Sequence, residues 1–87
     1  MIPRLVDMKY VSGHKIWISF EDGIEGEIDL ENELWGEVFE PLRKRAHFKT
    51  VRLDSELNTI CWENGADFAP EFLYAKLAPM KMSSATG

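Results

Sequence analysis

Hydrophobic and polar residues alternate in three segments near the start of the chain. Within residues 6–10, 15–20 and 24–30, every second position carries a hydrophobic side chain or a glycine. A period of two is typical of β-strands that bury one face. Ser12-Gly13 and Asp22-Gly23 supply turn residues between the segments. The pattern predicts a three-stranded antiparallel meander.

The alternation also predicts how the second and third strands pair. A two-residue loop at Asp22-Gly23 would set Phe20 opposite Glu25 and would place an acid on the core face. A loop of three residues sets Phe20 opposite Ile24 instead, and it needs Gly23 in the left-handed conformation. We therefore expect the three-residue loop.

By the same reasoning Tyr10 pairs with Ile16. In each strand, the residues that alternate with the core-facing ones then lie on the outer face of the sheet. The outer face is then expected to carry Trp17, its cross-strand neighbours Lys9 and Glu27, and the nearby Val11 and Leu5. A tryptophan on a polar sheet face, near other apolar groups, is typical of an interaction surface. A later segment folding over this face would explain it equally well.

The period changes to four over residues 30–46, which predicts helix. Gly36 and Pro41 interrupt the pattern, so two short helical pieces are expected, the first capped by Asp29. The stripe that repeats every four residues consists of Leu30, Leu34, Val38 and Leu42.

Strand patterning returns over residues 48–62, where a loop at 55–58 would let Val51 and Leu53 face Ile60 and Trp62. A closing helix is expected to begin at Pro70 and to end before Pro79. The predicted fold class is α+β, an antiparallel β-meander plus a second β-hairpin with short helices packed on one side. Residues 1–79 would form one domain, and residues 80–87 a flexible C-terminal tail.

Composition narrows the function classes. The chain has 87 residues, a formal net charge of -5 and one cysteine, Cys61, which excludes an internal disulfide and a thiolate zinc cage. No run of hydrophobic residues approaches the ~18 needed to cross a membrane. A cytoplasmic protein without membrane contact is expected. No pattern predicts catalytic or metal-binding residues or a cofactor, and the sequence favours a protein that is not an enzyme.

Charge is unevenly distributed. Residues 21–40 hold nine acids and no base, and residues 43–52 hold five bases and no acid. Such asymmetry steers a partner of complementary charge, or it simply forms solvated surface that matches helix dipoles. Only Phe48 adds an aromatic ring to the basic run, and the whole chain is acidic, so nucleic-acid binding by this domain is not expected.

Five short motifs follow one another along the chain. In order they are Phe20-Glu21-Asp22-Gly23, Phe39-Glu40-Pro41-Leu42, Phe48-Lys49-Thr50-Val51, Trp62-Glu63-Asn64-Gly65-Ala66-Asp67 and Pro70-Glu71-Phe72-Leu73-Tyr74. The ordered set resembles a bacterial family known only as a domain of unknown function, number twenty-four forty-two. The resemblance covers residues 5–75, nearly the whole predicted domain.

The resemblance implies a small α+β fold like the N-terminal domain of larger members, some of which carry a helix-turn-helix domain behind it. This chain ends where such a domain would begin, so the resemblance does not imply that it reads DNA directly. It also implies that stand-alone members are encoded beside another short protein, in pairs that look like toxin–antitoxin modules. The family brings no activity to assign to any residue.

Two function classes remain open. The first is a protein-interaction or regulatory module, favoured by Trp17, the charge asymmetry, the small size and the resemblance. The second is a small ligand-binding domain or enzyme, with its site formed by Asn64, Asp67, Glu71 and Tyr74. Carboxylates and a phenol suit acid–base chemistry or a divalent ion, but turn formation and helix capping explain them more simply. An exposed sheet edge would also allow a homodimer.

Overall fold

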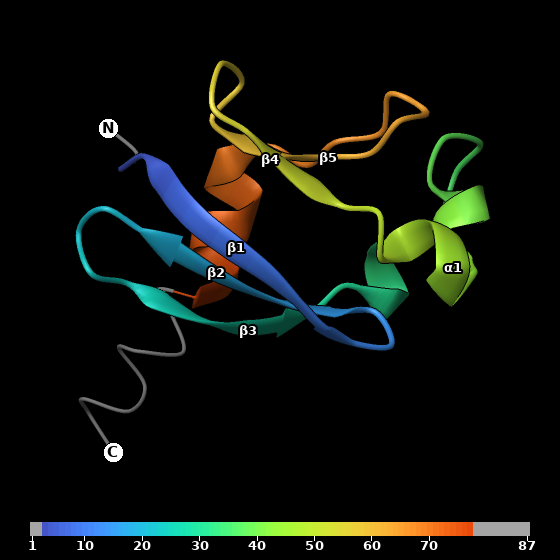
Figure 1. Cartoon of the computed structure of the whole chain (residues 1–87), viewed down its shortest axis with the longest axis horizontal. Helices are drawn as coiled ribbons and strands as arrows, with labels where there is room; N and C mark the ends of the chain where they lie inside the picture. Colours follow the sequence, from blue (N-terminus) through green and yellow to red (C-terminus); the bar gives the residue numbers. More distant parts are fainter. Residues whose placement is uncertain (1–2, 78–87) are drawn as a thin grey trace.

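The first three strands form the predicted antiparallel meander. The computed structural model describes residues 3–77. Strands β1 (Leu5–Ser12), β2 (Lys15–Phe20) and β3 (Glu25–Asp29) pair in the order β1-β2-β3 (Figure 1). The α+β class is confirmed.

The predicted register is also confirmed. The backbone N–H of Phe20 donates to the carbonyl of Ile24 at 2.9 Å, and Gly23 has a φ of 91°. Only glycine adopts that conformation without strain, so the turn sequence and the pairing support each other. Tyr10 lies opposite Ile16, as expected.

The start of β1 departs from the prediction. The pairing shifts by one residue between Leu5 and Asp7. This bulge turns Leu5 into the core, where it is 4% exposed, and leaves Val6 53% exposed. The backbone N–H of Leu5 donates to Asn58 Oδ1 at 2.8 Å, which fixes the bulged end against the second hairpin. The placement of Leu5 on the outer face was therefore wrong.

The segment after β3 forms two short 3₁₀ helices, as the interrupted pattern predicted, followed by one turn of α-helix. They are η1 (Glu31–Glu33), η2 (Glu40–Arg43) and α1 (Arg45–Phe48). Asp29 Oδ1 accepts a hydrogen bond from the backbone N–H of Glu31 at 2.9 Å. The N-cap residue of η1 is Leu30, which makes no side-chain capping bond, so the expected cap by Asp29 was wrong. Gly36, with a φ of 94°, breaks the stripe, which leaves Val38 47% exposed.

The second hairpin consists of β4 (Arg52–Asp54) and β5 (Thr59–Cys61), with Leu53 opposite Ile60. All three residues of β5 are buried, so the strand is covered on both faces. The hydroxyl of Thr59 donates to the carbonyl of Phe68, which satisfies a buried polar group. The closing helix begins at Pro70 as predicted and is described through residue 77. Its expected end at Pro79 and the tail at 80–87 lie outside the described residues.

The core lies between the meander, the second hairpin and the closing helix, which Figure 1 shows behind the meander. A Cβ built on Gly26 of β3 would lie 3.1 Å from Leu77 Cδ2, so the glycine lets this helix approach the strand closely. Trp62 Nε1 donates to the carbonyl of Phe48 at 2.9 Å within the core. The fully buried hydrophobic side chains include Ile16, Ile18, Leu30, Leu34, Phe48, Ile60 and Leu73.

Candidate functional site

The outer face of the meander is open and has Trp17 at its centre. Trp17 pairs with Lys9 of β1 and Glu27 of β3, and its side chain is only half-buried. Lys9 Nζ lies 5.5 Å from the centroid of the Trp17 ring, a cation–π contact. The charged residues around this tryptophan are all exposed: Asp7, Lys9, Lys15, Glu25, Glu27 and Asp29.

Four of the five residues expected on this face are found on it or at its margin. Val11, at the second irregularity of β1, is 40% exposed, and Leu5 belongs to the core instead. We use the name Trp17 surface for Trp17, Lys9, Val11 and Glu27. It combines one large, half-buried aromatic ring with one exposed charge of each sign.

The four residues of the second predicted site, Asn64, Asp67, Glu71 and Tyr74, are not hydrogen-bonded to one another. Asn64 Nδ2 donates to the carbonyl of Val38 at 2.8 Å, and its Oδ1 accepts from the N–H of Ala66 at 3.1 Å. Asp67 and Glu71 are exposed, and no described hydrogen bond joins any two of Asn64, Asp67, Glu71 and Tyr74. Asn64 therefore serves a turn. Among residues 3–77, no group of three or more His, Cys, Asp or Glu side chains is placed to hold a metal ion.

Tyr74 instead forms a hydrogen bond with a residue that is distant in the sequence. Its hydroxyl donates to Asp22 Oδ2 at 2.6 Å, and its ring packs edge-on against Phe20 with centroids 5.0 Å apart. This contact ties the closing helix to the turn between β2 and β3.

A family model described as "Protein of unknown function (DUF2442)" matches residues 5–79. The chain belongs to this family. No curated protein and no solved structure matches it. Within the described part of this DUF2442 chain, no helix is long and apolar enough to cross a membrane.

The contact between Tyr74 and Asp22 joins two of the motifs through which this chain resembles DUF2442. Asp22 belongs to the Phe20–Gly23 motif and Tyr74 ends the motif that begins at Pro70. Asn64, in a third motif, holds the segment that contains Val38. In this chain, these three motif residues build turns and connect segments that are distant in the sequence.

The bond between Tyr74 and Asp22 predicts a defined pH dependence. The Tyr74 hydroxyl, followed by the N–H of Ile24, holds the pKa of the Asp22 carboxyl below its ordinary value, and Asp22 raises the pKa of Tyr74. A lowered carboxyl pKa stabilises the fold above pH ~4 and loses that effect as the pH falls through the folded-state value. The raised phenol pKa stabilises the fold below pH ~10 and loses that effect as the pH rises through its folded-state value.

We therefore expect Tyr74→Phe to be less stable than the wild type between those limits, with the difference shrinking outside them. Carboxyl titration by NMR should show the pKa of Asp22 rising toward its ordinary value in Tyr74→Phe. Phenol absorbance should show the pKa of Tyr74 falling in Asp22→Asn. An Asp22 pKa that is identical in wild type and Tyr74→Phe would rule out the bond.

Trp35 is an exposed tryptophan that the sequence reasoning did not single out. It is 70% exposed, next to the left-handed Gly36 in the segment between η1 and η2. The hydrophobic pattern could have indicated this exposure, because Trp35 lies one residue beyond Leu34 and so outside the stripe that repeats every four residues.

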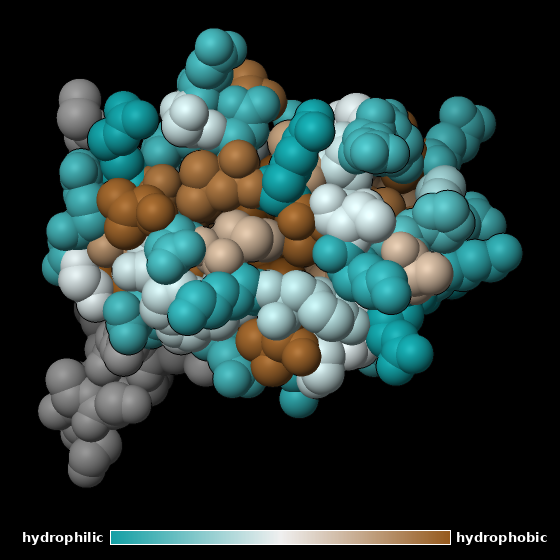
Figure 2. All heavy atoms as spheres, viewed as in Figure 1, coloured by the Kyte–Doolittle hydropathy of each residue, from teal (hydrophilic) through white to brown (hydrophobic). Residues whose placement is uncertain are grey.

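A band of hydrophobic side chains lies where β1 runs beside β4 (Figure 2). On these two strands, Val6 of β1 is exposed, and Met8 of β1 and Leu53 of β4 are partly buried against the core. The two strands are not hydrogen-bonded to each other in either sheet. Met8 and Leu53 therefore extend the core to the contact between β1 and β4.

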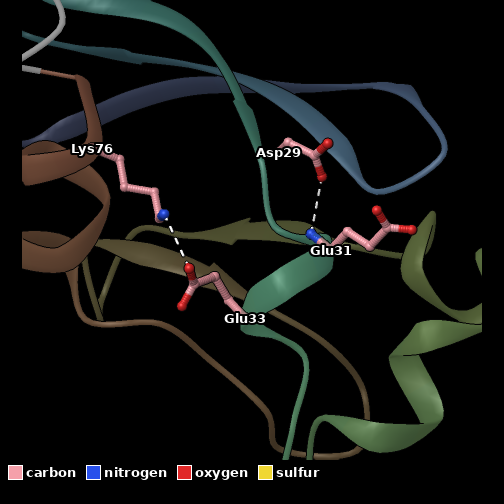
Figure 3. A network of polar contacts seen from close by, with 4 residues as sticks. All are labelled: Asp29, Glu31, Glu33 and Lys76. Atoms are coloured by element: carbon pink, nitrogen blue, oxygen red, sulfur yellow. Dashed lines mark hydrogen bonds and ion pairs between the residues drawn. The ribbon is translucent and has the colours of Figure 1, made fainter.

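Acidic residues gather where β3 leads into η1 (Figure 3). Lys76 of the closing helix points to Glu33, with Nζ 3.1 Å from Oε2. Asp29 Oδ1 accepts the hydrogen bond from the N–H of Glu31 at the start of this segment. A hollow of about 440 Å³ beside β3 is lined by Lys15, Glu27, Ile28, Asp29 and Lys76.

The basic run is exposed around α1. Arg43 Nε donates to the carbonyl of Leu34 at 2.9 Å, and His14 Nε2 lies 2.7 Å from the carbonyl of Arg43. Lys44, Arg45 and Lys49 are exposed. Phe48 is fully buried, so its ring is not available for stacking on bases.

Proposed function

We propose that this domain is a protein-interaction module and that the Trp17 surface is its contact. The observation that carries the proposal is a tryptophan at the centre of an open sheet face, flanked by an exposed lysine and an exposed glutamate. Burying an aromatic ring of this size is strongly favourable, and tryptophan is enriched among the residues that dominate binding energy. Lys9 and Glu27 would form the polar rim that fixes the orientation of a partner.

We further propose that the partner is the product of a neighbouring gene. The domain would then have a regulatory role within a two-gene pair, as the resemblance implies. A second copy of this chain is the competing partner, and both are separated by the same experiment. A ligand-binding or enzymatic role at Asn64, Asp67 and Glu71 has less support, because Asn64 is engaged in turn contacts and the two carboxylates are exposed.

Trp17→Ala should reduce recovery of the partner at least ~10-fold, as expected when a central aromatic residue is removed. The measurement is a quantitative pull-down from the native host with the tagged chain, followed by titration of the purified partner. Trp35→Ala is the matched control, because it removes an exposed tryptophan outside the Trp17 surface. Circular dichroism and urea denaturation confirm that both variants fold.

Equal recovery with Trp17→Ala and wild type would contradict the assignment of the Trp17 surface. Loss with Trp35→Ala alone would move the contact to the segment between η1 and η2. Recovery of the chain itself as the sole partner would make the module a homodimer.

A further inference from the structure

Within residues 3–77, no strand pairs with the outer edge of β3. Backbone hydrogen bonds from Phe20 to Ile24 and from Leu30 to His14 mark the two ends of the pairing between β2 and β3. Hydrogen-bonded pairs alternate with non-bonded pairs in an antiparallel ladder, and the register here is unbroken. Glu25, Glu27 and Asp29 therefore belong to the non-bonded set, whose N–H and C=O groups point away from β2.

The side chains of the same three residues are exposed carboxylates on the outer face. They recur at every second position, which spaces them ~7 Å apart along the strand. Lys15 lies opposite Asp29 at one end, and Lys76 is already paired with Glu33. The edge thus combines a row of backbone donors and acceptors with a row of negative charges.

A hollow borders the same part of β3. The hollow of about 440 Å³ is lined by Glu27, Ile28 and Asp29 of β3 and by Lys76 of the closing helix. Within the described residues, β3 is an edge strand of its sheet and pairs with β2 alone.

Charge decides between two occupants of this edge. A second copy pairing through its own β3 would set Glu and Asp side chains against Glu and Asp, and like charges on adjacent strands are destabilising. Charged edge residues are a common way in which proteins prevent such self-pairing. A strand with Lys or Arg at every second position would instead meet each carboxylate with a base.

We propose that the edge of β3 binds an extended, basic segment of a partner protein, which adds a fourth strand to the meander. The segment pairs its backbone with Glu25, Glu27 and Asp29 and lays its basic side chains beside their carboxylates on the outer face. This inference rests on the proposed function, because Glu27 also belongs to the Trp17 surface, and it names the chemistry of the partner.

The test uses the full chain and synthetic eight-residue peptides with blocked ends. One peptide alternates lysine with valine and another alternates glutamate with valine. Two further lysine–valine peptides are N-methylated, the first at every lysine and the second at every valine. Binding is measured by calorimetry, and the site is located by amide shifts in ¹⁵N NMR spectra.

We expect the lysine–valine peptide to bind and to shift the amides of residues 25–29, while the glutamate–valine peptide does not bind. An added strand directs every second N–H toward β3. One of the two N-methylated peptides should therefore bind at least ~10-fold more weakly than the unmethylated lysine–valine peptide, and the other should bind with the same affinity. Equal affinities of the two N-methylated peptides would overturn strand addition.

Glu25→Lys should weaken the lysine–valine peptide roughly fivefold, because it reverses one of three charges. Glu56→Lys is the matched control, since it makes the same charge change in the exposed loop between β4 and β5. Equal weakening by both variants would show a general charge effect and overturn the proposal.

The two proposals fail separately. If no peptide binds residues 25–29 but Trp17→Ala loses the host partner, the edge inference is wrong and the proposed function stands. If the peptides bind as expected and Trp17→Ala keeps the host partner, the edge stands and the Trp17 surface does not.

Discussion

Replacing Phe48 by alanine should lower the free energy of unfolding by about 3–5 kcal/mol, a large part of the stability of a domain this small. Phe48 is fully buried at the end of α1. Its ring lies against Tyr10, His14 and Trp62, with centroids 6.2, 5.1 and 5.5 Å away. These neighbours come from β1, the turn after it and the end of the second hairpin.

The loss should be large because the cavity cannot close easily. Two of the three neighbours are held by contacts that the substitution keeps. Tyr10 is held by its pairing with Ile16, and Trp62 by the hydrogen bond from its Nε1 to the backbone carbonyl of residue 48. Packing that relaxes only partly leaves a void and loses its contacts.

Urea denaturation monitored by fluorescence measures this effect. Leu57→Ala is the control, because Leu57 is 54% exposed in the loop between β4 and β5 and its truncation should change stability by no more than about 0.5 kcal/mol. A loss below about 1 kcal/mol for Phe48→Ala would mean that α1 does not anchor the core.

Leu73→Ala should cost about 2–5 kcal/mol and loosen the closing helix. Leu73 is fully buried in the core, on the helix that begins at Pro70. Alanine is the better helix former, so helix propensity would offset the loss slightly and the measured effect comes from packing. The bond from Tyr74 to Asp22 should also weaken, because the same helix carries Tyr74.

Glu71→Ala on the same helix provides the comparison. Glu71 is exposed and makes no described side-chain hydrogen bond, so its replacement should leave stability within about 0.5 kcal/mol. Urea denaturation gives the stability, and near-ultraviolet circular dichroism reports the packing of the aromatic rings. Equal effects of the two substitutions would contradict the burial of Leu73.

The sequence by itself determined the meander and its register. Period-two alternation leaves one acceptable pairing, because a shift of one residue would carry Glu25 to the core face. Gly23 then supplies the left-handed turn residue that this pairing needs, with a φ of 91°. The position of Trp17 on the outer face followed from the same alternation. The start of the closing helix at Pro70 was likewise local, since proline suits the first helical turn.

Only the tertiary structure decided the features that depend on distant residues. Leu5 turned inward because its N–H bonds Asn58, 53 residues away, and the bulge reversed the expected face. Nearness in sequence suggested a site at Asn64, Asp67, Glu71 and Tyr74, but Tyr74 bonds Asp22, 52 residues away. The burial of β5 on both faces and the exposure of Trp35 also depend on what packs beside them. Alternation and turn residues act between near neighbours, so the sequence fixes local pairing, while packing between segments chooses which polar groups meet and which surfaces stay open.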